Sequence, residues 1–167
     1  MEKDVVVSQI RAALKMLRAA IEACPDPLWN RESDHNRFWV LAYHALFFAH
    51  LYLFPSEKAF ERWEKEIDGC PNMGREHLGD WTKLQASDLF AKSDVLAYCA
   101  YVDGLVFERV ESTPFDAPVE FSWLRQPCTQ FELHLANIRH IQHHAGQLSE
   151  RLRQTVDSGI DWVKAVR

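Results

Sequence analysis

The sequence predicts an all-α protein in which four main helices pack as a bundle around one core. In four long segments, apolar residues recur at every third or fourth position, which is the spacing of a helix buried on one side. No segment shows the sustained alternation of apolar and polar residues that is typical of a half-buried strand. The 167 residues include only six glycines and seven prolines, and a chain of this length fits a single domain, residues 1–167.

The first helix is expected over residues 4–23, because its apolar side chains alternate between spacings of three and four positions. They are Val7, Ile10, Leu14, Leu17 and Ile21. Pro25 and Pro27 follow, and we expect them to end the helix, since proline lacks the N–H donor and disfavours helical backbone in the residue before it.

The second helix is expected to begin at Ser33 or Asp34, because either side chain can cap a helix. It should continue through an apolar, aromatic-rich stretch to Phe54. Pro55 then interrupts the chain, and an extra short helix is expected over residues 57–67, where the sequence is mostly amphipathic.

The second half of the chain supplies the other two main helices. Residues 68–88 hold three of the six glycines and are expected to form a long loop. The third main helix is expected over residues 88–109 or 94–109, and the last over residues 129–157. Between them, residues 113–127 contain three prolines, which predicts a long irregular crossover.

Composition excludes several classes of partner. Nineteen basic and 24 acidic residues give a net charge of −5, with no run of lysine or arginine, which argues against nucleic acid or an anionic membrane surface. The longest apolar stretch, residues 38–54, is interrupted by His44 and His50, so a buried helix fits it better than a membrane span. The four cysteines form no C-x-x-C motif and no signal-peptide pattern is present, which predicts a cytoplasmic protein with free thiols.

Histidine is the unusual component, with eight copies. His140 and His144 are four positions apart, so a helix places both imidazoles on one face, where they can bind the same metal ion. A metal site needs at least a third ligand, and His44 lies beside the apolar stripe of the second helix much as His144 lies beside its own. Three neutral imidazoles suit Zn²⁺, Ni²⁺, Cu²⁺ or Fe²⁺.

The same histidines also have a simpler interpretation. A pair at this spacing arises by chance among eight histidines, and a histidine beside an apolar stripe can belong to the core. His134 is interpreted as such a core histidine, while His50 falls on the opposite side of the second helix and His143 toward solvent. Other chemistries lack their motifs: there is one Glu-x-x-His where a ferritin-like di-iron site needs two, and neither H-E-x-x-H nor G-x-S-x-G occurs.

Residues 140–148, HIQHHAGQL, resemble the C-terminal helix signature of the DinB-like (YfiT-like) superfamily. That signature has a histidine, three residues, a second histidine and then typically Arg-Gly-Gln, so Ala145 departs from it. Residues 38–48, FWVLAYHALFF, are similar to the aromatic-rich segment that carries the third histidine of the superfamily. The resemblance implies an up-down-down-up four-helix bundle. It also implies a metal site formed by His44, His140 and His144.

By the same resemblance the protein is expected to be a cytoplasmic homodimer that binds zinc, nickel or iron. Some members transfer or isomerise small molecules with a low-molecular-weight thiol as cosubstrate. We therefore expect a metal-dependent enzyme of the thiol-transferase or hydrolase kind, in which the metal activates a thiol or water. The alternative is a non-catalytic metal- or ligand-binding protein. The sequence assigns no general base. His50, His143 and Glu132 are candidates for outer partners of the metal ligands, that is, residues that contact the ligands without binding the metal.

Gly146 lies two residues after His144, inside the predicted last helix. Glycine within a helix costs about 1 kcal/mol relative to alanine, so its presence in a well-formed helix asks for a reason. We expect the missing side chain to let a neighbouring helix or a ligand approach the backbone beside the metal.

Overall fold

The computed structural model describes residues 2–65 and 90–166, and within them it contains five helices and no strand. The helices are α1 (Glu2–Ala23), α2 (Asp26–Trp29), α3 (Phe38–Leu51), α4 (Lys92–Ser112) and α5 (Gln130–Val156). The all-α prediction is therefore confirmed. The expected loop at residues 68–88 lies outside the described residues.

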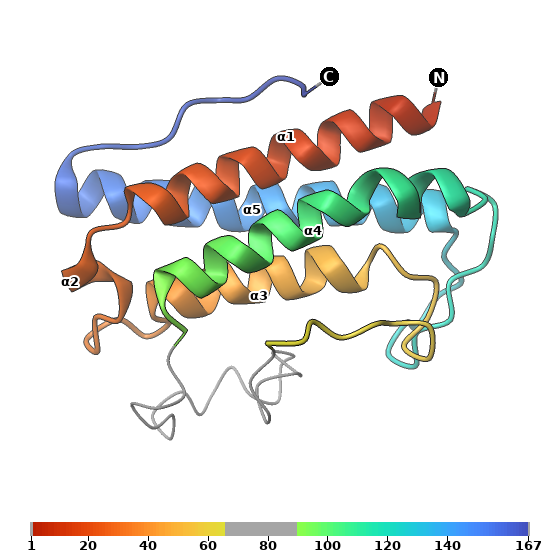
Figure 1. Cartoon of the computed structure of the whole chain (residues 1–167), viewed down its shortest axis with the longest axis horizontal. Helices are drawn as coiled ribbons and strands as arrows, with labels where there is room; N and C mark the ends of the chain where they lie inside the picture. The colour runs from red at the N-terminus through yellow and green to blue at the C-terminus, as the bar shows by residue number, and fades with distance from the viewer. Residues whose placement is uncertain (1, 66–89, 167) are drawn as a thin grey trace.

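The four long helices lie side by side around a shared apolar core (Figure 1). Helices α1 and α5 run in one direction, and α3 and α4 run in the other. Helix α1 packs on α4 and α5, and α3 packs on the same two helices from the other side. The two helices that carry the predicted ligands, α3 and α5, are therefore direct antiparallel neighbours.

The predicted apolar positions of α1 form its buried face. Ile10, Leu14, Leu17 and Ile21 are each at most 1% exposed, and Val7 is 8% exposed. The helix ends at Ala23, two residues before the first of the two prolines. Pro27 nevertheless stands in the first turn of the four-residue helix α2, where proline is tolerated because the first N–H groups of a helix have no partner within it.

Helix α3 begins at Phe38, later than the sequence predicts. Asp34 does not cap it, because its carboxylate forms ion pairs with Arg31 at 2.8 Å and with Arg151 of α5 at 3.8 Å. Helix α3 is buried on almost every side. Of its residues, His44 and Phe48 are partly exposed, and all the others are buried. These two residues share one face, one turn apart.

The extra short helix predicted over residues 57–67 is wrong for its described part, residues 57–65, which are turns and irregular chain. This segment instead pairs with the crossover between α4 and α5. Ser56 forms an isolated bridge with Glu120, and the Glu57 carboxylate accepts a hydrogen bond from the Ser122 hydroxyl at 2.8 Å. Contacts between distant parts of the chain therefore replace the local helical bonds.

Helix α5 follows the predicted boundaries to within one residue and begins with a capping box. The Thr129 hydroxyl accepts a hydrogen bond from the backbone N–H of Glu132, and the Glu132 carboxylate accepts one from the backbone N–H of Thr129. The Thr129 hydroxyl also donates to the Glu132 carboxylate at 3.0 Å, and the two hydrogen bonds that the carboxylate accepts lower the pKa of Glu132. None of the helices in the described ranges has the length and apolar character that crossing a membrane requires.

Candidate metal site

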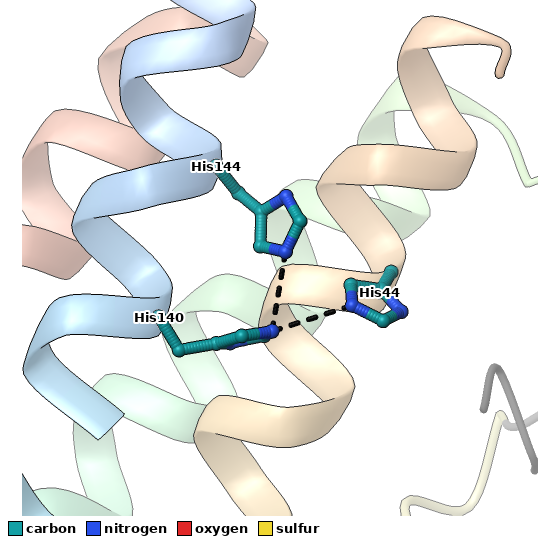
Figure 2. Close-up of side chains that lie close together, drawn as sticks. All are labelled: His44, His140 and His144. Atoms are coloured by element: carbon teal, nitrogen blue, oxygen red, sulfur yellow. Dashed lines mark hydrogen bonds between the residues drawn. The ribbon is translucent and has the colours of Figure 1, made fainter. Parts of the chain in front are cut away.

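His44, His140 and His144 point their rings into one space between α3 and α5 (Figure 2). The Nε2 atom of His140 lies 3.3 Å from Nε2 of His44 and 3.1 Å from Nε2 of His144. One nitrogen from each ring lies within 4.8 Å of the other two. The structure thus brings together all three ligands that the sequence predicts, from helices nearly a hundred positions apart in the chain.

These separations fit a metal ion. Zinc binds imidazole nitrogen at about 2.0–2.1 Å, so two nitrogens in a tetrahedral site lie about 3.3 Å apart. The described residues supply no thiolate or carboxylate to this cluster. Three imidazoles would fill three positions of a tetrahedron and leave the fourth for a water molecule or a ligand.

Gln147 determines which nitrogen of His144 carries the proton. Its side-chain oxygen lies 2.8 Å from Nδ1 of His144, and since an amide oxygen can only accept, Nδ1 is the donor. The lone pair of the neutral ring is therefore on Nε2, which faces the other two histidines. Gln147 occurs in the motif that carries the family resemblance, and its position three residues after His144 is the sequence signal for this role, which was not predicted.

Burial keeps His140 and His144 neutral. Burial, together with the neighbouring imidazoles, lowers the pKa of His140 to about 3 and that of His144 to about 4. At neutral pH both rings therefore offer lone pairs rather than N–H⁺ groups. The Nδ1 atom of His140 is buried and has no hydrogen-bond partner among the described residues, so packing holds this ring in place.

Aromatic rings surround the cluster on the side of α3. The Phe48 ring centroid lies 4.9 Å from that of His44 and 5.4 Å from that of His140, and Tyr52 lies 6.1 Å from His140. Phe48 is the other partly exposed residue of α3, so the single face on which this helix is not buried is the face of the site.

The other histidines do not join the cluster. His50 is fully buried on the opposite side of α3, where its Nδ1 lies 3.0 Å from the hydroxyl of Tyr98. His134 is also fully buried, beside the ring of Phe115, and it is the core histidine that the sequence predicts. His77 lies outside the described residues.

Of the three residues that the sequence offers as outer partners of the metal-binding histidines, one lies beside them in the structure. His143 is exposed, and its ring centroid lies 5.1 Å from that of His144. His50 is occupied in its own aromatic cluster, and Glu132 caps the first turn of α5. Neither of those two contacts a ligand.

The expectation that a neighbouring helix approaches the backbone at Gly146 is wrong. Gly146 is exposed, and a Cβ atom built on it would meet nothing within 4 Å. Neither a helix nor any other described residue approaches the backbone there, so the absence of a side chain has no packing role.

The described residues also line a surface hollow of about 350 Å³ that is separate from the histidines. Its lining consists of Ser56, Glu57, Lys58, Glu120, Phe121 and Ser122.

Comparison of the chain with profiles of known protein families, with curated proteins and with solved structures finds no significant match.

Proposed function

We propose that this protein binds one divalent metal ion through His44, His140 and His144 and belongs to the DinB-like superfamily. The observation that carries the proposal is the position of Nε2 of His140, which lies 3.3 Å from Nε2 of His44 and 3.1 Å from Nε2 of His144. The antiparallel directions of the helix pairs support an up-down-down-up bundle. The motif HIQHHAGQL and the aromatic-rich segment around His44 support the family assignment.

The donor set favours zinc, nickel or iron. Neutral imidazole is a good ligand for all three metals, whereas magnesium and calcium prefer carboxylate and carbonyl oxygens. The lowered pKa values of His140 and His144 favour binding near neutral pH, because neither ring must lose a proton to bind the metal.

We further propose that the protein is an enzyme of the thiol-transferase or hydrolase kind that acts on a small molecule, with a low-molecular-weight thiol as a possible cosubstrate. Sites with three protein ligands are typical of catalytic metals, because they leave one position open. A bound divalent ion lowers the pKa of a thiol or water and so supplies a nucleophile near neutral pH. The chain would contribute the rest: Gln147 orients His144, and Phe48 and Tyr52 exclude water on one side.

A non-catalytic metal- or ligand-binding protein is the second candidate, and one observation favours it. No carboxylate among the described residues is hydrogen-bonded to His140 or His144, so the usual carboxylate partner of a metal-bound histidine is absent there. The ring of the exposed His143 lies beside that of His144, with 5.1 Å between the ring centroids.

Metal analysis of untagged protein, followed by a thiol-conjugation screen, tests the proposal and separates the two candidates. We expect one zinc, nickel or iron ion per chain, and thiol conjugation or hydrolysis that stops when a chelator removes the ion. Stoichiometric metal with no turnover across the screen would favour the non-catalytic candidate. Homodimer formation and a cytoplasmic location stay predictions from the sequence and its resemblance.

A further inference from the structure

A row of aromatic side chains leads from His140 to the protein surface. Phe48 and Tyr52 contact the His140 ring, and the Tyr52 ring centroid lies 5.9 Å from that of Trp123. The Trp123 ring stacks on Phe121 at 5.1 Å with an interplanar angle of 18°. We call Phe48, Tyr52, Phe121 and Trp123 the aromatic wall.

The wall combines two distant parts of the chain that are held together by backbone hydrogen bonds. His44, Phe48 and Tyr52 follow one another at intervals of four residues, so α3 and its C-cap present all three on one face. The crossover supplies Phe121 and Trp123. It is anchored by the N–H of Glu120 on the carbonyl of Pro55 at 2.8 Å and by the N–H of Val119 on the carbonyl of Cys128 at 2.9 Å.

The wall reaches the surface at Trp123. Phe48 and Tyr52 are half-buried and Phe121 is buried behind Trp123, whereas 45% of Trp123 is exposed. A large aromatic side chain this accessible, linked to His140 through the ring of Tyr52, offers apolar area that a bound ligand would remove from water. Ring pairs in offset or edge-to-face contact are favoured beyond the area they bury, so this surface favours a planar ring over an aliphatic chain of the same size.

One polar group interrupts the wall. The hydroxyl of Tyr52 makes no hydrogen bond with the described residues, and a phenol hydroxyl is an O–H donor. It can donate to a polar atom of a ligand that lies against the rings.

We propose that the aromatic wall binds the planar aromatic group of a small ligand whose sulfur or oxygen donor takes the open position on the metal. This inference rests on the proposed metal site and names the class of ligand that the site prefers. A thiol of this class would bind as the thiolate and release its proton to solvent.

Cobalt(II)-loaded protein provides the test, because a thiolate that binds cobalt produces a charge-transfer band whose growth gives the dissociation constant. The probes are benzyl mercaptan, cyclohexylmethanethiol, propane-1-thiol and the cationic thiol cysteamine. We expect benzyl mercaptan to bind roughly tenfold more tightly than propane-1-thiol and several-fold more tightly than cyclohexylmethanethiol, since ring contacts add to apolar burial.

Matched variants assign the preference to the wall. Trp123→Ala should bring the affinities for benzyl mercaptan and propane-1-thiol to within about threefold of each other while cobalt loading stays complete. Tyr52→Phe should keep the preference, because it keeps the ring. Trp162→Ala is the control: Trp162 is 71% exposed in the C-terminal tail, which runs beside α1 and away from α3 (Figure 1).

The results distinguish this inference from the metal site on which it rests. Complete cobalt loading with equal affinities for all four thiols, a preference for cysteamine, or an equal loss in Trp162→Ala would overturn the aromatic wall and leave the metal site standing. Failure of the wild-type protein to bind cobalt, zinc or nickel would overturn the proposed function itself, and the inference with it.

Discussion

The Nδ1 atom of His144 lies 2.8 Å from the side-chain oxygen of Gln147, one turn further along α5. Hydrogen bonds of this kind fix the ring orientation and the tautomer of a metal-binding histidine. Here the bond directs the lone pair on Nε2 toward His44 and His140. A surface glutamine thus belongs to the proposed site although it would not touch the metal.

Replacing Gln147 tests this relationship. Gln147→Leu should weaken zinc binding about 10- to 100-fold, the usual cost of losing such a partner, with little change in helix content. Gln147→Glu should retain or increase the affinity, because a carboxylate accepts the same hydrogen bond more strongly. Competition with a chromophoric chelator measures both affinities. Gln154→Ala, near the end of α5, is the control, and an affinity loss as large as that of Gln147→Leu would refute the orienting role.

Removal of the metal should leave the helices intact. The ligands come from α3 and α5, which are held by their own apolar contacts, so the metal adds stability by mass action instead of creating the fold. Far-ultraviolet circular dichroism of chelated protein should therefore match that of the zinc form, while the melting temperature rises with zinc concentration. Collapse to coil after chelation would indicate a structural metal and favour the non-catalytic candidate.

His134 should make the protein sensitive to acid. Its ring is fully buried, neither ring nitrogen has a hydrogen-bond partner among the described residues, and burial lowers its pKa from 6.5 to about 4. The folded state binds this proton less readily than the unfolded state. The contribution of His134 to stability is therefore complete above pH 6.5 and is lost as the pH falls toward 4, a change on the order of 3 kcal/mol.

The variant His134→Leu checks this linkage in chelator-containing buffer. It should be at least as stable as the wild type at pH 7, because it removes two unpaired polar atoms from the core. Between pH 7 and pH 5 it should lose about 2 kcal/mol less than the wild type in urea unfolding. His35→Leu, at an exposed position, controls for the loss of a surface histidine. Equal losses in His134→Leu and the wild type would contradict the prediction.

Gly146→Ala should raise the free energy of unfolding by about 1 kcal/mol, the difference in helix propensity, because the new methyl group meets nothing within 4 Å. Metal affinity should be unchanged, since Gly146 faces away from the neighbouring helices. Thermal unfolding and a zinc titration measure the two quantities. A loss of zinc affinity would show that the glycine does have a part in the site.

Much of this architecture could be predicted because helical periodicity is local. The spacing of apolar residues gives α1 its buried face, and Thr129 with Glu132 marks the start of α5. The same periodicity places His140 and His144 on one face. What could not be predicted depends on distant contacts. Arg151 forms an ion pair with Asp34, which does not cap α3, and Ser122 binds Glu57, so residues 57–65 form no helix. The contact between Tyr52 and Trp123 is of the same kind.

Metal stoichiometry in single variants tests the central claim most directly. Wild-type protein, loaded with zinc and freed of excess by gel filtration, should retain one ion per chain. His44→Ala, His140→Ala and His144→Ala should each lose stoichiometric zinc, while His50→Ala and His143→Ala should keep it, provided that circular dichroism shows each variant folded. Full zinc content in any one of the first three variants would remove that residue from the site, and loss of zinc in none of them would contradict the three-histidine centre altogether.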